Sequence, residues 1–204
     1  MEIKDRILRH ATMLFLQKVI KSVSMDDIAA SLAISKKTLY KWFANKDEMV
    51  FAVMQQHLNA TQHDCEQVQA QATSAIDELF RMMDWMRRQF HEVHPSIFYD
   101  MQKFHPTTWQ LWVSHKHEYI LNQISDNLRR GIAEGLYRPE LDVEVLARLR
   151  LAQIELAFNA DVYSPRHFEV QRLQQVILEH FMLGVATLKG HKLINSYRHV
   201  LEAD

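Results

Sequence analysis

Glycine, proline and cysteine are scarce in this chain of 204 residues, which holds four glycines, four prolines and one cysteine. Tight turns between β-strands depend on glycine and proline, so a fold of many short strands is not expected. The single cysteine, Cys65, cannot form an internal disulfide bond or a multi-cysteine metal site. The composition therefore favours helices joined by short connections.

Long apolar runs are also absent, and no stretch approaches the about 18 apolar residues of a membrane-spanning helix. The first ten residues alternate charged and apolar side chains, which is not the pattern of a secretory signal peptide. We therefore expect a cytoplasmic protein without a membrane partner.

No excess of one charge marks the whole chain, because its net charge is −1 at pH 7. The distribution is nevertheless uneven. Residues 1–50 carry nine Lys or Arg against six Asp or Glu, whereas the remainder carries fifteen against nineteen. The sign of this difference suits an N-terminal part that faces phosphates, on a neutral to acidic body.

Apolar residues recur with helical spacing along most of the chain, which predicts an all-α fold. The expected helices cover residues 2–18, 25–32, 36–43, 46–71, 74–93, 96–104, 107–134, 142–162 and 165–190. The expected N-cap residues are Ser24, with Asp27 completing a capping box, and Ser35, Asn45, Asp142 and Ser164.

Three of these helix starts lie close together, at Ser24, Ser35 and Asn45. Helices this short bury little surface alone, so we expect them to pack on the first helix. Their predicted shared core consists of Ile28, Ala29, Leu32, Ile34, Leu39 and Phe43. Two short helices joined by a three-residue turn have the dimensions of a helix-turn-helix motif.

The second short helix carries hydrogen-bond donors on its exposed face, and Lys46 begins the helix that follows. These donors are Lys36, Lys37, Thr38, Tyr40 and Lys41. Such side chains can bind phosphates, and Lys and Thr can also reach base edges. Taken alone, a solvated basic surface explains the pattern at least as well as DNA binding.

Residues 7–50 resemble the N-terminal domain of the TetR family of transcription regulators. The similarity is carried, with spacing intact, by Ile7-Leu8, Ala11, Leu14-Phe15, Ser24 to Ala29, Ser35 to Tyr40, Phe43 and Asn45-Lys46-Asp47. The chain departs from the family pattern at three places. It has Val19-Ile20 in place of glycine before an aromatic residue, Val23 where threonine is frequent, and Ala33 where glycine often precedes the recognition helix.

The resemblance implies a three-helix helix-turn-helix DNA-binding domain over residues 1–47 and a helical ligand-binding and dimerisation domain over residues 48–204. It implies a homodimeric regulator, most often a repressor, that binds a palindromic operator in double-stranded DNA and responds to a small effector. The implied DNA contacts are Ser24, Ser35, Lys36, Lys37, Thr38, Tyr40, Lys41, Trp42 and Lys46. No enzymatic activity, cofactor or metal site is predicted.

The predicted helices over residues 142–162 and 165–190 are apolar on more than one face, as at Leu149 and Ile177. A helix that is apolar nearly all round is buried on both sides. A partner chain on the second side is the interpretation that the family favours. A central helix within a monomer is the alternative.

The middle of the chain is rich in aromatic residues and methionine, which line adaptable apolar pockets but also fill ordinary cores. The candidate effector-binding residues are Phe80, Met83, Phe90, Phe104, Trp109 and Trp112. The effector would be small and largely apolar. Two other functions stay open at this point: a small all-α enzyme, for which no nucleophile or paired-carboxylate motif is visible, and a helical dimeric adaptor without a DNA-binding role.

Overall fold

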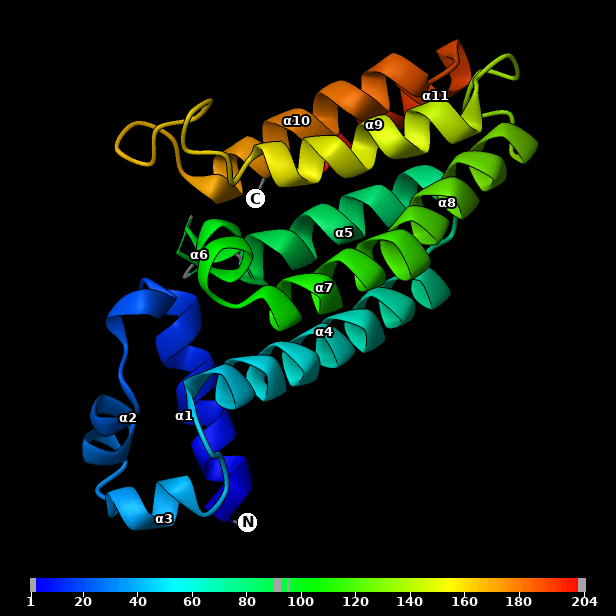
Figure 1. Cartoon of the computed structure of the whole chain (residues 1–204). Helices are drawn as coiled ribbons and strands as arrows, with labels where there is room; N and C mark the ends of the chain where they lie inside the picture. Colours follow the sequence, from blue (N-terminus) through cyan, green and yellow to red (C-terminus); the bar gives the residue numbers. More distant parts are fainter. Residues whose placement is uncertain (1–2, 90–92, 95, 202–204) are drawn as a thin grey trace. The chain divides into compact units, whose positions relative to one another are not determined.

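The structure, a computed structural model, describes residues 3–89, 93–94 and 96–201 (Figure 1). Over these residues it is all-α, as predicted, and its only strand-like pairing is an isolated antiparallel bridge between Tyr137 and Ala186. The helices are α1 (Ile3–Gln17), η1 (Ile20–Ser22), α2 (Met25–Ser31), α3 (Lys36–Tyr40), α4 (Lys46–Gln71), α5 (Ala75–Gln89), α6 (Ile97–Phe104), α7 (Pro106–His115), η3 (Lys116–Ile120), α8 (Leu121–Ala133), α9 (Val143–Leu156), α10 (Val170–Val185) and α11 (Leu188–Leu201).

The chain forms two compact units, and each is described by itself. As far as its residues are described, the N-terminal unit comprises residues up to 63 together with residues 93–115, and the C-terminal unit comprises residues 64–89 and from 116 onward. Helix α4 contributes to both units, as the sequence suggested. The expected boundary after residue 47 is a functional one, and it stays a prediction.

The N-terminal unit is built on the apolar face of α1, with Ile7, Ala11 and Phe15 fully buried. The residues expected to pack against this face are only partly enclosed. Ile28, Ala29, Leu39 and Phe43 are buried, whereas Leu32 and Ile34 are half-buried at the edge of the core. Helices α6 and α7 also belong to this unit, and α6 packs against η1.

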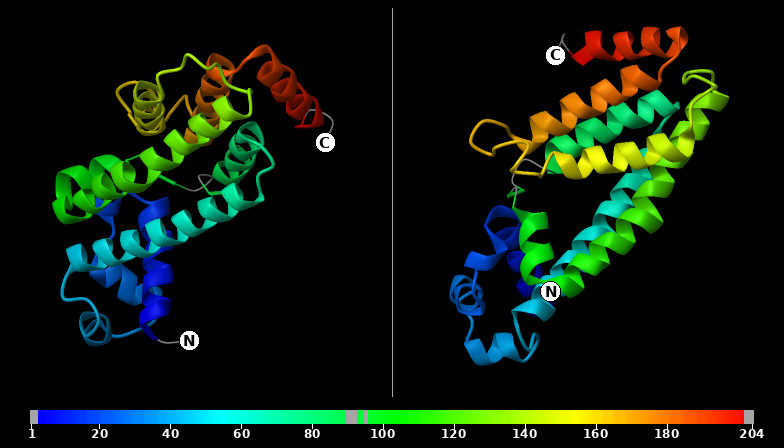
Figure 2. Two further views of the ribbon diagram at one scale, coloured as in Figure 1. Left: turned by 90° about the vertical axis from the view of Figure 1, so that its right-hand side faces the viewer. Right: turned by 45° about the horizontal axis from the view of Figure 1, so that its top comes forward.

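The C-terminal unit is a bundle in which α8 packs on α9 and α5 packs on α8, α10 and α11. In the right-hand view of Figure 2, α5 (teal) lies beside α10 (orange) in this bundle. Its core includes Ile76, Leu128, Leu178, Phe181 and Met182, all buried. Burial of such large side chains contributes about 1.5–3 kcal/mol each, which stabilises the unit.

One long helix was expected over residues 107–134, and the structure corrects this. Helix α7 ends at His115, the π-helical segment Lys116–Ile120 follows, and α8 begins at Leu121. A π-helical turn contains about one residue more than an α-helical turn. The spacing of apolar residues over a long segment therefore changes too little to reveal it. The hydrophobic pattern therefore predicted the extent of the helical run but missed its interruption.

The end of the chain also differs from the expectation of a single helix over residues 165–190. Ser164 supports one turn only, in which its carbonyl accepts from the amides of His167 and Phe168. Helix α10 begins after Glu169 and ends at Val185, and α11 begins at Leu188. The preceding helix α9 likewise ends at Leu156, short of the expected Val162.

Long-range hydrogen bonds explain the break between α10 and α11. The amide of Thr187 donates to the carbonyl of Leu136 (2.9 Å), and the amide of Arg138 donates to the carbonyl of Val185 (3.0 Å). These bonds hold Ala186 in an extended conformation against the turn that follows α8. Position 190, inside α11, requires glycine, because a Cβ atom there would lie 2.2 Å from the Leu136 carbonyl oxygen.

No helix in the described ranges is both long enough and apolar enough to cross a membrane.

Candidate nucleic-acid interface and effector site

Helix α2 begins with the capping box that the sequence predicted. The Ser24 hydroxyl accepts from the Asp27 amide (3.1 Å), and the Asp27 carboxylate accepts from the Ser24 amide (2.9 Å) and hydroxyl (2.6 Å). The hydrogen bonds from the Ser24 side chain and backbone lower the pKa of Asp27. Ser24 is exposed, but its hydroxyl already makes hydrogen bonds within the N-cap of α2. A phosphate that bound Ser24 would have to compete with these hydrogen bonds.

Helix α3, the predicted recognition helix, begins at the expected N-cap Ser35 and is shorter than expected, ending at Tyr40. The Ser35 hydroxyl accepts from the Thr38 amide (3.0 Å) and lies 2.8 Å from the Thr38 hydroxyl. A cap of this kind contributes about 1 kcal/mol. Leu39 anchors α3 in the core, which leaves the opposite face of the helix in solvent.

Two of the predicted basic contacts have partners within the chain. The Lys36 ammonium pairs with Asp26 at 2.5 Å, an ion pair between exposed side chains. The Lys46 ammonium donates to the carbonyl oxygens of Ile20 (2.6 Å) and Lys21 (3.3 Å). These hydrogen bonds hold the turn after α1, and burial lowers the pKa of Lys46.

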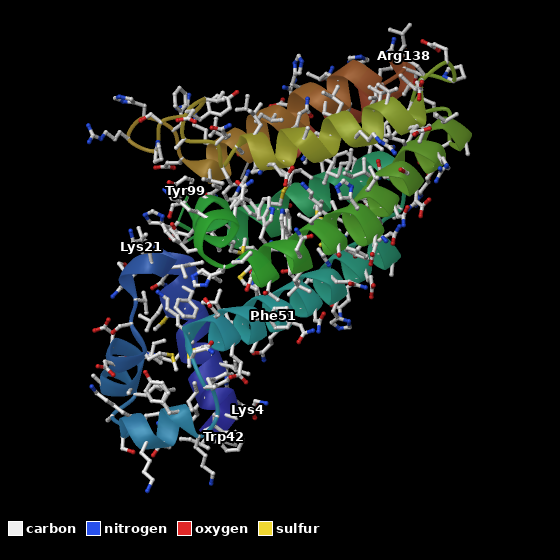
Figure 3. The ribbon with its side chains drawn as sticks, in the orientation of Figure 1. Lys4, Lys21, Trp42, Phe51, Tyr99 and Arg138 are labelled. Carbon is white, nitrogen blue, oxygen red and sulfur yellow. The ribbon has the colours of Figure 1, made fainter. Side chains whose placement is uncertain are left out.

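Lys37, Tyr40 and Lys41 are the exposed donors of α3 whose side chains make no hydrogen bond or ion pair with other described residues. Tyr40 is 48% exposed, which is high for an aromatic side chain. Long nitrogen-tipped side chains extend from α3 into solvent in Figure 3, which also labels the half-buried Trp42 just beyond the helix. The face of α3 can therefore donate to phosphates and base edges without first breaking internal contacts.

The turn between α2 and α3 has an unusual residue at its centre. Ala33 has a φ of 53°, and it is the one non-glycine residue with positive φ in the described chain. The left-handed conformation costs an alanine about 1–2 kcal/mol, and glycine adopts it without that cost. The family pattern that residues 7–50 resemble often has glycine at this position, where the conformation carries no such cost.

We expect Ala33→Gly to stabilise the protein by about 0.5–1 kcal/mol, because relief of this strain exceeds the added entropy of the unfolded chain. Ala30→Gly is the matched control, since Ala30 is exposed within α2 and glycine there should cost about 0.5–1 kcal/mol. Urea denaturation measures both. Equal destabilisation by the two substitutions would contradict the assignment of strain to Ala33.

The candidate effector-binding residues are divided between the two units. Phe80 and Met83 are buried in the core of the C-terminal unit, where Phe80 stacks on Tyr197 with ring centroids 4.8 Å apart. Phe104, Trp109 and Trp112 belong to the N-terminal unit, in which Trp112 is buried against Phe98. Phe90 lies outside the described residues. A common effector pocket formed by all six stays a prediction.

The outer faces of α9 and α10 keep apolar side chains in solvent. Val145, Leu149 and Val176 are between 48% and 58% exposed. Val145 and Leu149 are four residues apart, so they lie on one face of α9. These are the helices for which the sequence predicted a second buried side.

Sequence reasoning missed a charged residue in the C-terminal unit. Arg150 lies between Leu149 and Leu151 on α9 and is only 5% exposed. Burial lowers its pKa to about 10, so the guanidinium still carries its charge at neutral pH. Ala147, Arg150 and Leu151 share the buried face of α9, and this spacing is the signal that could have revealed the residue.

Comparisons with known proteins agree with this architecture. Residues 7–53 match the family model described as bacterial regulatory proteins, tetR family. The HTH-type transcriptional repressor KstR2 of Mycolicibacterium smegmatis is 27% identical over 148 residues, which cover 71% of this chain and 72% of that protein.

Solved structures show the same fold over nearly the whole chain. The ketosteroid transcriptional regulator KstR2 of Mycobacterium tuberculosis superposes with a TM-score of 0.65 and 20% identity, covering 91% of this chain and 96% of that one. A TetR-family regulator of Agrobacterium tumefaciens superposes with a TM-score of 0.75 and 16% identity, covering 90% and 97%. The solved structures show the fold, and the family model over residues 7–53, the curated repressor relatives and the helix-turn-helix unit with its exposed donors together identify the chain as a DNA-binding transcription regulator of the TetR family.

Proposed function

We propose that this regulator is a cytoplasmic repressor that binds a palindromic operator as a homodimer and releases it when a small, largely apolar effector binds the C-terminal unit. The carrying observation is the face of α3, where Lys37, Tyr40 and Lys41 are exposed and have no partner among the described residues. The relatives named as repressors support the direction of the regulation.

In this proposal α3 enters the major groove. Lys37 and Thr38 lie near its N-terminal end, where side chains of a recognition helix contact base edges. Tyr40, Lys41 and Ser24 contact phosphates, and Lys46 does so while it also holds the turn after α1. Ser35, Lys36 and Trp42 lie at the border of this surface, where Lys36 must exchange Asp26 for a phosphate.

Dimerisation is proposed to use the exposed faces of α9 and α10, because TetR-family regulators act as dimers and these faces carry Val145, Leu149 and Val176 in solvent. A two-fold interface brings the same patch from both chains together. Such a dimer can present two recognition helices about 34–36 Å apart, the separation of successive major grooves.

Leu149→Asp is expected to weaken the dimer at least about 100-fold, or about 2.7 kcal/mol, because each chain would bury a new charge in the apolar interface. Leu149 is 48% exposed in the single chain, so folding should survive. The control Leu188→Asp places the same charge at an 84% exposed site on α11. Analytical ultracentrifugation checks both, and a Leu149→Asp protein that stays as dimeric as wild type contradicts this interface.

The proposed effector is apolar because the C-terminal unit offers aromatic and methionine side chains such as Phe80 and Met83 on α5. One relative is described as a ketosteroid transcriptional regulator, which fits a largely apolar molecule. An enzyme or an adaptor without a DNA-binding role is not favoured, since the relatives are transcription regulators.

The deciding experiment is fluorescence anisotropy of the protein with labelled duplexes from the DNA that flanks its own gene. Binding should fall steeply with salt, because each phosphate contact releases condensed counterions. Specific binding should exceed binding to scrambled duplex by at least about 1,000-fold. Affinity that varies neither with salt nor with sequence would refute the proposed function.

A further inference from the structure

Arg150 is a buried cation that has no anionic partner within the described part of the chain. It is 5% exposed, and no carboxylate oxygen of the described residues lies within 4.0 Å of its guanidinium. The guanidinium lies over the ring of Phe181, whose centroid is 5.8 Å from the guanidinium carbon. Its Nη1 atom is buried and makes no hydrogen bond.

Two other arginines of the C-terminal unit, unlike Arg150, form ion pairs with carboxylates. Arg81 pairs with Asp77 at 2.9 Å, and Arg130 pairs with Glu134 at 2.8 Å, although both arginines are far more exposed than Arg150. Burying an unpaired charge is costly, and proteins usually satisfy such a group with an opposite charge or hydrogen bonds. Arg150 is thus more deeply buried than these two arginines, yet it lacks the counter-charge that both of them have.

Two further buried polar atoms lack partners on the same pair of helices. Gln174 on α10 is 1% exposed; its Nε2 donates to the Ile154 carbonyl (2.8 Å), but its Oε1 has no hydrogen bond. Gln153 Oε1 on α9 is also buried and unsatisfied. Arg150, Gln153 and Ile154 follow helical spacing on α9, while Gln174 and Phe181 are two turns apart on α10.

We propose that Arg150 binds the carboxylate of an apolar carboxylic acid, and that Gln153 and Gln174 accept hydrogen bonds from hydroxyl or N–H groups of the same molecule. The planar guanidinium fork matches a carboxylate with two parallel hydrogen bonds. Phe181 and Leu178, both buried, supply apolar contacts beside the charge. This inference rests on the proposed function in one respect, since it takes the acid to be the effector.

The test uses matched pairs of an acid and its neutral amide, namely decanoate with decanamide and 1-naphthoate with 1-naphthamide. Isothermal titration calorimetry of the full chain without DNA should show at least one acid binding at least tenfold more tightly than its amide. Arg150→Met should abolish that preference. Arg148→Met, on the exposed side of the same helix, is the control and should retain it.

The free Arg150→Met protein should also melt at a higher temperature than wild type, by roughly 3 °C, because the substitution removes an unpaired buried charge. Acids that bind no better than their amides, or a preference that survives Arg150→Met, would overturn the inference. A melting temperature lowered by Arg150→Met would do so as well. None of these measurements uses DNA. A negative result would therefore refute acid binding at Arg150 without bearing on operator binding, and a protein that bound no operator could still be tested for acid binding.

Discussion

A variant with both Lys37→Ala and Lys41→Ala is expected to lose operator affinity at least about 100-fold at 0.1 M salt. Lys37 on α3 and Lys41, its C-cap residue, are exposed and have no internal partner in the described structure, so both ammonium groups are available to DNA. A dimer carries each substitution twice, which removes four contacts from the complex. The slope of log affinity against log salt should fall by about one for each lost phosphate contact.

The control for this variant is a double substitution of the same charge in the C-terminal unit, Arg148→Ala with Lys192→Ala. Both side chains are exposed, and neither lies in the helix-turn-helix. It should leave operator affinity within about threefold of wild type, because it changes net charge but no direct contact. If the two double variants weakened DNA binding equally, α3 would not be the recognition helix.

Gly190→Ala is expected to destabilise the C-terminal unit by about 3 kcal/mol or more. The new methyl group would lie 2.2 Å from the Leu136 carbonyl oxygen and 3.1 Å from the Ala186 Cβ. That carbonyl accepts from the Thr187 amide and is part of the backbone, so it cannot rotate away as a flexible side chain would. Overpacking of a close contact normally costs about 1–3 kcal/mol, and a backbone neighbour places this site at the upper end.

Asn195→Ala is the control, since Asn195 is exposed on α11 and alanine is the better helix former there. It should leave stability unchanged or raise it slightly. Chemical denaturation with a far-ultraviolet circular dichroism signal measures both proteins. A Gly190→Ala protein as stable as wild type would show that the contact between α11 and the turn after α8 is not close in solution.

Four of the five expected N-caps were predictable because their hydrogen bonds are local, whereas Ser164 does not begin the helix expected there. Ser24, Ser35 and Asp142 accept from amides three residues later, as does Asn45 from the Glu48 amide, so a short stretch of sequence contains both partners. The same holds for the buried face of α1, where helical spacing alone indicates Ile7, Ala11 and Phe15. Local geometry, and the resemblance of residues 7–50, sufficed for the helix-turn-helix unit.

The candidate site was only partly predictable, because the partners of its side chains lie far away in the sequence. Lys36 and Lys41 are both lysines at exposed positions, yet Lys36 pairs with Asp26, ten residues earlier. Lys46 donates to carbonyls about 25 residues away. The periodicity of the sequence does not reveal such contacts. The sequence could therefore identify the basic side chains as candidates, but it could not show which of them are free to bind DNA.

The sequence by itself determined the helical class, the caps of the first helices and the family of this protein, because each depends on neighbours within a turn or on a motif read directly along the chain. Only the tertiary structure decided where α10 ends and α11 begins, since that break depends on the pairing of Ala186 with Tyr137 about 50 residues away. It also decided that Arg150 is buried without a counter-charge. Burial and pairing are set by the side chains that other helices bring to a residue, and those helices are distant in the sequence.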